Sequence, residues 1–457
     1  MTGHSASASS GSGVKALLIV PVVLATLGLG LRSVIPAPRQ APTKLQAADE
    51  LRWFKGNVHT HSHWSDGDDY LESIGLWYRD QGYNFLTFTD HNVLANVERW
   101  VEIDKTKGRR VAFDKLKAKF PDWVETRTVD GKEQVRLRRF DEVAPKLNVD
   151  RKFLLIQGEE LSDFFHSPDH GKLPIHINAG NVYQKMSPAG GASIADVIQN
   201  NVDQVMKQRE TTGQVMMVHL NHPNFGWAVR AEDIMRVIGE RFFEVYNGHP
   251  GVNNKGNEER AGTEKIWDIV LTKRLAELKL PVMYGLAVDD GHEYHNIPSR
   301  KSEPGRGWVM VLAPKLTATS LILAMEAGQF YSSSGVTLKT VESSDRGLSV
   351  EVDPVPGETY TIEFFGTKKG YNPVGEPVVG KDGKTLHTTH RYSPEIGASL
   401  GKVQGTSARY DFKGDEIYVR ATVTSSGMHP NPSEVGDFKQ AWVQPVIGPA
   451  CPPSDEK

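Results

Sequence analysis

The chain has 457 residues, of which 39% are hydrophobic and 24% charged, with 53 Lys and Arg against 56 Asp and Glu. This composition is typical of a folded protein with one large and one small domain, and it argues against disorder and against a nucleic-acid partner. Cys451 is the single cysteine, so an intrachain disulfide and a cysteine zinc site are excluded. Any bound metal must therefore be held by His, Asp and Glu.

Residues 1–50 are predicted to precede the folded body. The uncharged apolar run at 16–31 fits either a signal peptide or a membrane anchor, because its length falls between those typical of the two. Arg32, Arg39 and Lys44 follow this run, against the positive-inside pattern of an exported body. We expect export to the periplasm or the cell exterior, with membrane attachment through an uncleaved segment as the alternative, and a Pro-rich linker before the body.

From residue 51 to about 335, short apolar strands alternate with helical patterns. Strands are predicted at 84–90, 152–160, 214–222, 241–248, 280–290 and 307–314. Helices are predicted at 193–210, 263–278 and 317–328, with Ser193, Thr263 and Thr319 as candidate N-caps. Such alternation is typical of βα units, so we expect an α/β fold with a parallel sheet, either a barrel or a layered sheet.

Two segments depart from this alternation. A basic insertion at about 100–150 contains an Asp130-Gly131 turn between alternating residues, which predicts a β-hairpin. The insertion either covers the functional site or forms a solvated segment on the surface. Residues 336–450 contain only short strands, predicted at 348–353, 359–366, 408–412, 416–425 and 439–446. This pattern predicts a small β-sandwich-like domain, followed by a tail at 451–457.

Nearly all histidines and carboxylates that could bind a metal stand at the carboxyl ends of the predicted strands. In parallel α/β folds these ends converge on one face, so residues far apart in sequence can meet there. The residues in question are His59, His61, Asp90, His91, Glu159, Glu160, His219, His222, Glu244, Asp289, Asp290 and His292.

The first of these groups has a spacing that favours metal binding. On a strand, His59 and His61 point to the same face and can bind one ion, whereas His63 points to the opposite face and is left out of the ligand set. A polar loop is the alternative for these two histidines alone. A mixture of imidazole and carboxylate ligands suits Zn, Mn or Fe without selecting one of them.

Five short motifs, in order, resemble those of one family. The stretches HTHSHWSDG from His59, FTDHN from Phe88, GEELS from Gly158, NHP from Asn221 and DDGH from Asp289 are similar to the motifs of the PHP superfamily of metal-dependent phosphoesterases. The later YVRATV and AWVQPV resemble its CehA/McbA-like branch. The resemblance implies a distorted seven-stranded (β/α)7-type barrel over 51–335, with two or three divalent metal ions at the carboxyl ends of its strands.

Position by position, the resemblance implies metal ligands at His59, His61, Asp66, His91, Glu160, His222, Asp290 and His292. Two neighbours leave alternatives open, since Glu159 adjoins Glu160 and His219 precedes His222. Asp289 is an extra acid, and Asp290 is assigned because it alone has the two-residue spacing to His292. His176, in the strand-like stretch PIHINAGN, is a candidate metal ligand or substrate contact. His176 and His219 are the candidate catalytic residues, either of which could protonate a leaving oxygen.

The metal site that the resemblance implies would activate a water to hydrolyse a small-molecule phosphoester. No G-x-S-x-G motif is present to suggest a serine nucleophile instead. Arg300, Lys301 and Arg306 follow the last ligands and are candidate contacts for phosphate oxygens, with a solvated basic loop as the alternative for at least two of them. A carbamate or aryl ester hydrolase with the same metal site is the alternative. A non-catalytic exported binding protein is a third interpretation, which the complete ligand set disfavours. The sequence predicts neither the substrate nor the oligomeric state.

Overall fold

The computed structural model describes residues 50–451. The predicted signal or anchor segment at 16–31 and the last six residues of the predicted tail lie outside this range. In the described range, no helix combines the length and the apolar character needed to cross a membrane.

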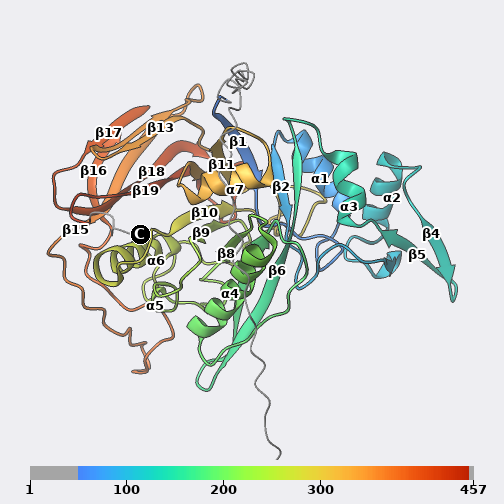
Figure 1. The fold of residues 1–457 in the computed structure, drawn as a ribbon, viewed down its shortest axis with the longest axis horizontal. Helices are drawn as coiled ribbons and strands as arrows, with labels where there is room; N and C mark the ends of the chain where they lie inside the picture. The colour runs from blue at the N-terminus through green and yellow to red at the C-terminus, as the bar shows by residue number, and fades with distance from the viewer. Residues whose placement is uncertain (1–49, 452–457) are drawn as a thin grey trace, which may run out of the picture. The chain divides into compact units, whose positions relative to one another are not determined.

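Nineteen strands and seven α-helices make up the described fold (Figure 1). The strands are β1 (Arg52–Asn57), β2 (Phe85–Phe88), β3 (Arg99–Glu102), β4 (Thr126–Val129), β5 (Lys132–Leu137), β6 (Leu154–Ser167), β7 (Gly171–Gly180), β8 (Met217–Leu220), β9 (Phe242–Asn247), β10 (Tyr284–Val288), β11 (Trp308–Ala313), β12 (Phe330–Ser333), β13 (Leu338–Ser344), β14 (Gly347–Val352), β15 (Tyr360–Lys368), β16 (Ala398–Gln404), β17 (Ser407–Asp411), β18 (Glu416–Met428) and β19 (Phe438–Ile447). The helices are α1 (Leu71–Asp80), α2 (Arg109–Lys119), α3 (Phe140–Leu147), α4 (Ile194–Thr212), α5 (Ala231–Ile234), α6 (Thr263–Thr272) with a π-helical extension (Lys273–Leu278), and α7 (Ala318–Glu326).

The largest sheet has 13 strands in the order β10-β9-β8-β7-β6-β2-β1-β11-β12-β19-β18-β15-β16. The pairs β10/β9, β9/β8, β6/β2 and β2/β1 are parallel, whereas β8/β7, β7/β6 and β1/β11 are antiparallel. The expected parallel sheet is therefore wrong, and the sheet is mixed. The cause is local, because β6 and β7 are joined by a turn at residues 168–170, and a hairpin can only be antiparallel.

The sheet brings the carboxyl ends of β1 and β10 together, although these strands stand six places apart in its order. A parallel bridge joins Thr60 to Gly291. The N–H of His61 donates to the Gly291 carbonyl at 3.0 Å, and the N–H of Asp290 donates to the His59 carbonyl at 3.2 Å. Residues that follow β1 therefore lie beside residues that follow β10. The seven-stranded barrel itself stays a prediction.

The N-caps of the three predicted helices were only partly right. The Ser193 hydroxyl caps α4 as expected, accepting from the Asp196 N–H at 3.1 Å. Gly262, not Thr263, caps α6, because the Thr263 hydroxyl donates instead to the Val245 carbonyl. The cap of α7 is Thr317 rather than Thr319.

The insertion forms a small sheet of its own. Its order is β3-β5-β4, and Asp130 and Gly131, both at positive φ, make the turn of the predicted β4–β5 hairpin. Helices α2 and α3 lie beside this hairpin in Figure 1. Apolar residues of the insertion share a core with α1, so the insertion is packed onto the body and is more than a solvated loop.

The strands after residue 336 form two layers. The β19, β18, β15 and β16 part of the large sheet faces the small sheet β13-β14-β17 across a core that contains Ile362, Phe364 and Val419. This arrangement has the two packed sheets expected of a sandwich-like region. Because β12 pairs with both β11 and β19, the large sheet runs through the predicted boundary, and the division into two domains stays a prediction.

Candidate metal centre

Two buried imidazoles face one another just after β1. The side chain of Asn57, the last residue of β1, accepts from the His59 N–H at 2.8 Å and turns the chain toward the site. His59 and His61 are fully buried, and their Nε2 atoms lie 3.1 Å apart. Two such atoms in one place are suited to neighbouring or shared cations.

Two buried carboxylates close on these imidazoles. Asp290 Oδ1 lies 3.2 Å from His59 Nε2 and 3.1 Å from His61 Nε2. Glu160 Oε2 lies 3.3 Å from His61 Nε2, and Glu160 Oε1 lies 3.6 Å from His59 Nε2. Both carboxylates are thus placed to bridge between the two imidazoles.

Glu160 also meets three further histidines. His91 Nδ1 lies 2.7 Å from its Oε2, while His176 Nδ1 lies 3.0 Å and His222 Nε2 3.6 Å from its Oε1. An isolated parallel bridge between residues 91 and 160 fixes the first of these contacts. Glu160 is therefore the carboxylate around which the site is built.

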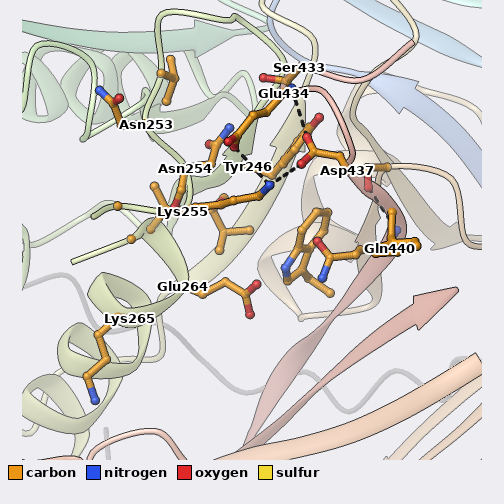
Figure 2. Close-up of a pocket in the computed structure, with 18 of the residues that line it drawn as sticks. Tyr246, Asn253, Asn254, Lys255, Glu264, Lys265, Ser433, Glu434, Asp437 and Gln440 are labelled. Carbon is orange, nitrogen blue, oxygen red and sulfur yellow. Dashed lines mark hydrogen bonds and ion pairs between the residues drawn. The ribbon is translucent and has the colours of Figure 1, made fainter. Parts of the chain in front are cut away.

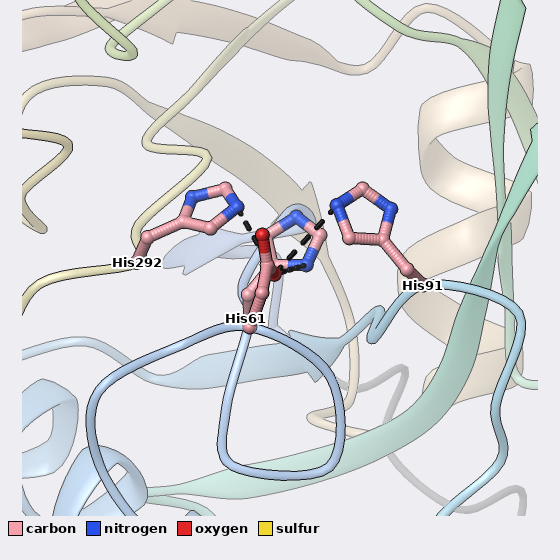
Figure 3. Close-up of side chains that lie close together, drawn as sticks. His61, His91 and His292 are labelled. Atoms are coloured by element: carbon pink, nitrogen blue, oxygen red, sulfur yellow. Dashed lines mark ion pairs between the residues drawn. The ribbon is translucent and has the colours of Figure 1, made fainter. Parts of the chain in front are cut away.

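A third group lies toward the surface. Figure 3 shows His61, His91 and His292 pointing toward one another from separate segments. Asp66 Oδ1 lies 3.4 Å from His292 Nε2 and 3.7 Å from His91 Nε2. The Asp66 side chain is 54% exposed, whereas that of His61 is fully buried, so the cluster opens at Asp66.

All ten sequence-predicted site residues lie together in this part of the fold. They belong to overlapping groups in which the potential ligand atoms lie within 4.8 Å of one another. The groups are His61, Asp66, His91 and His292; His59, His61 and Glu160; His59, His222 and Asp290; His59, His219 and Glu244; and His91, Glu160 and His176.

Polar side chains around the cluster hold its imidazoles and carboxylates in position by hydrogen bonds. Glu244 Oε1 lies 2.6 Å from His59 Nδ1, and its Oε2 accepts from the His222 N–H and from the Asn247 side chain. Asn221 donates to Glu160 at 2.7 Å. Glu244 is one of the acids that the sequence places at a strand end, and Asn221 begins the NHP motif, but the spacing of neither residue predicts these contacts.

His219 lies deeper than His176. A row of paired residues runs across three strands from Glu160 on β6 through Asn178 on β7 to His219 on β8. His219 Nε2 lies 3.3 Å from Glu244 Oε1, and its side chain is 3% exposed, against 16% for His176. His176 is thus the candidate catalytic residue that reaches toward the opening.

Glu159 and Asp289, the two acids adjacent to the candidate ligands Glu160 and Asp290, are both engaged elsewhere. Glu159 Oε1 accepts from the Met186 N–H at 2.7 Å, and burial raises its pKa to about 7. Asp289 accepts from the N–H groups of residues 306 and 307 and from the Tyr78 hydroxyl. Neither carboxylate takes part in the metal-binding groups of the described chain.

Two other side chains are also used for structure. His63 turns away, with Nδ1 2.9 Å from the Gly67 carbonyl. Arg306 is fully buried and donates to the Gly248 carbonyl and to Glu303, so its sequence-based assignment as a phosphate contact is wrong. Arg300 and Lys301 are exposed.

The imidazoles and carboxylates of the cluster shift one another's pKa values. Burial alone would lower the pKa of His59, but the carboxylates of Asp290, Glu244 and Glu160 raise it well above its usual value. Burial would raise the pKa of Glu160, yet His91, His176 and His59 hold it well below its usual range. The carboxylates therefore stay ionised and need cations beside them.

The arrangement fits divalent metal ions. His61 Nδ1 is buried without a hydrogen bond from any described residue, and burial lowers the pKa of His61 to about 3. A neutral imidazole and an ionised carboxylate are the forms that bind metals. Nitrogen and oxygen donors together suit Zn, Mn or Fe.

Two cavities are lined by residues that are close in sequence to those of the cluster. One, of about 540 Å³, is lined in part by Asp66 and by residues of β3. The other, of about 530 Å³ (Figure 2), lies between residues 245–265 and 433–442, where Lys255 pairs with Glu434 and Asp437. The second cavity is lined by none of the ten predicted site residues.

Comparisons with known proteins give short or distant similarity. No family model matches the chain. A stretch of 74 residues, 16% of the chain, is 30% identical to the DNA polymerase/3'-5' exonuclease PolX of Bacillus subtilis (strain 168) and spans 13% of that protein. A two-domain protein from Bacteroides vulgatus ATCC 8482, described as containing a predicted PHP-like metal-dependent phosphoesterase, aligns over 90% of this chain and 100% of its own. The identity there is 14% and the TM-score 0.37.

Proposed function

We propose that the protein is a metal-dependent hydrolase of the PHP superfamily, in its CehA/McbA-like branch, that cleaves phosphoesters. The observation that carries the proposal is the approach of His59, His61, Glu160 and Asp290, four buried side chains from three distant segments with ligand atoms 3.1 to 3.6 Å apart. The resemblance of the five motifs supports membership of this superfamily. The similarity to a polymerase with exonuclease activity supports the bond class, because an exonuclease hydrolyses phosphodiesters.

The ligand roles follow from the contacts. Glu160 and Asp290 would bridge ions held by the buried histidines, and Asp66 would complete an outer position with His91 and His292. The proposed ligands are His59, His61, Asp66, His91, Glu160, His222, Asp290 and His292, for two or three ions. When bound, such ions lower the pKa of a coordinated water to about 7 and neutralise charge on the phosphoryl group.

The chain's own groups complete the reaction. In hydrolysis a bond forms between phosphorus and the water oxygen, which gives up a proton to solvent, while the bond between phosphorus and the ester oxygen breaks and the leaving alcohol takes a proton. We assign the delivery of that second proton to His176, which is partly exposed and whose Nδ1 lies 3.0 Å from Glu160. His219 would position Glu244 and thereby His59.

A substrate panel with metal analysis tests the proposal. The body from residue 48 onward is purified, its metal content measured, and turnover compared on p-nitrophenyl phosphate, bis(p-nitrophenyl) phosphate and an aryl carbamate, each with Zn²⁺, Mn²⁺ and Fe²⁺. We expect at least two ions per chain and metal-dependent release of p-nitrophenol from a phosphoester. Turnover of the carbamate alone would replace phosphoester hydrolysis by carbonyl chemistry, and a protein that binds no metal would refute the site.

A further inference from the structure

The cavity of about 530 Å³ shown in Figure 2 lies between the segment that follows β9 and strand β19. One wall consists of residues 250–256 and the first turn of α6, and the other of residues 433–442. None of the proposed metal ligands lines it. Cavities of about 300–1,000 Å³ hold small-molecule ligands, so this one is large enough for a ligand of its own.

Alternate residues of β19 face this cavity. Phe438, Gln440 and Trp442 are spaced by two, so their side chains point to the same face of the strand, and all three line the cavity. Their exposure falls along the strand, from 46% for Phe438 to 2% for Trp442. The cavity therefore has an exposed aromatic ring at its rim and a buried indole at its inner end.

The buried indole carries a hydrogen-bond donor that the described chain does not use. Trp442 Nε1 is buried and has no hydrogen-bond partner among the described residues. The ring is held in place by stacking on Tyr246, with the two centroids 5.3 Å apart. Because an unpaired buried donor costs free energy, a ligand oxygen that accepts from Trp442 Nε1 would bind favourably.

Two acceptors also face the cavity. Figure 2 shows the side chains of Glu264 on α6 and Gln440 on β19 projecting into it from opposite walls. Glu264 accepts from Arg420 and Thr422 through Oε2, and Gln440 donates through its amide nitrogen to Thr424 at 3.3 Å. Glu264 Oε1 and the Gln440 carbonyl oxygen are thus left to accept from a ligand.

The lysines of the lining are engaged by the chain itself. Lys255 Nζ lies 2.6 Å from Asp437 Oδ1 and 3.1 Å from Glu434 Oε2, and Lys265 donates to the Ile396 carbonyl. The carboxylates of Asp437 and Glu434 are neutralised in the same contacts. The cavity therefore favours an uncharged ligand and disfavours an anion such as phosphate.

We propose that this cavity binds a saccharide. A hydroxyl group both donates and accepts, so neighbouring sugar hydroxyls can accept from Trp442 Nε1 and donate to Glu264 and Gln440. The face of an aromatic ring is negative, so the exposed ring of Phe438 attracts the C–H groups on one face of a pyranose. The site is separate from the metal centre and does not rest on the proposed hydrolase function.

Calorimetry on the full chain tests the proposal with glucose, galactose, N-acetylglucosamine, maltose, cellobiose and N,N′-diacetylchitobiose as probes. We expect at least one of these sugars to bind with a Kd of about 1 mM or lower, and Phe438→Ala and Trp442→Phe each to raise that Kd about tenfold. The matched control is Met428→Ala. Met428 is the cross-strand neighbour of Phe438, is 61% exposed and lies outside the lining, so this change should leave the Kd unaltered.

Phe438→Ala keeps the test decisive if Trp442→Phe does not fold, because Phe438 is exposed whereas Trp442 is part of the core. Its metal content and phosphoester turnover should equal those of wild type. Absence of binding by all six sugars, or an equal Kd in wild type and Phe438→Ala, would overturn the saccharide site. Inorganic phosphate binding that is weakened by Phe438→Ala and Trp442→Phe would overturn it too, since the cavity would then be an anion site. None of these outcomes bears on the metal centre.

Discussion

At the scale of single residues, the adjacent pair Glu159 and Glu160 illustrates how one position decides the chemistry. The two side chains point to opposite faces of β6. Glu160 meets five imidazoles, whereas Glu159 accepts a backbone hydrogen bond from Met186. Gly158 just before them is required for space, because a Cβ there would lie 2.6 Å from the Ala179 carbonyl oxygen. A larger residue at 158 would therefore push β6 away from β7 at this position.

Glu160→Gln should lower bound metal and reduce kcat by more than about a hundredfold, because loss of groups that merely orient ligands already lowers affinity or activity by 10–100-fold. An amide cannot supply the charge that a bridging carboxylate gives to two cations. Glu159→Gln, the matched neighbour, should keep metal content and turnover near wild type. Metal analysis and steady-state kinetics on both variants check this, and equal losses would show that the wrong face of the strand had been assigned.

The family resemblance gave the candidate histidines and Asp66, and spacing favoured Asp290 over Asp289 without giving a physical reason for the choice. Asp289 and Asp290 are the same residue type and differ in backbone conformation. Asp290 adopts a positive φ of 51°, and its carboxylate points into the cluster. That conformation is strained for a residue other than glycine and persists where the surrounding structure enforces it. The two-residue spacing to His292 favoured Asp290, but the backbone conformation that directs its carboxylate depends on the tertiary fold.

At the scale of elements, the residues that form strands and helices could be predicted, but strand directions could not. Apolar runs at 84–90, 214–222 and 241–248 became β2, β8 and β9. The long hairpin of β6 and β7 is not predicted, because its tip at 166–172 is mostly polar and exposed and shows no buried apolar pattern. Its antiparallel pairing made the sheet mixed and also placed His176 beside Glu160.

A buried arginine and a buried glutamate lie near the segment that leads into β9. Arg274, on the π-helical extension of α6, donates to the carbonyls of Val237 and Pro281. Glu240, 1% exposed, lies near it, and burial raises the pKa of Glu240 to about 8. The fold therefore favours the protonated carboxyl group at this position.

Stability should depend on this group in a predictable direction. Because the folded-state pKa of about 8 exceeds the usual 4.5, the stability that the neutral form contributes is complete below pH 4.5 and is lost as pH rises to 8. Glu240→Gln mimics the neutral form, so its Tm should exceed that of wild type at pH 9 and converge with it at pH 5. Thermal unfolding of both proteins across this range checks the prediction. Tm curves that run parallel would show that Glu240 does not titrate with folding.

At the scale of the whole molecule, the site exists only because the sheet brings its distant strands together. His59 and His61 follow β1, whereas Asp290 and His292 follow β10, more than two hundred residues later. The bridge between Thr60 and Gly291 joins these segments directly. The sequence predicted that strand ends would converge, but which ends would touch depends on a mixed strand order that local patterns do not encode.

Metal content and turnover of Asp290→Asn, His61→Ala and the double variant test the central claim most directly. If both residues hold the same ions, each single change should lower bound metal and abolish hydrolysis, and the double change should be scarcely worse than either, because groups that act as a unit are not additive. The variants should still fold, since the apolar core of a body of this size is stable without metal. Full metal content with near-normal turnover in Asp290→Asn would contradict the account, because it would separate the residues after β10 from the metal centre.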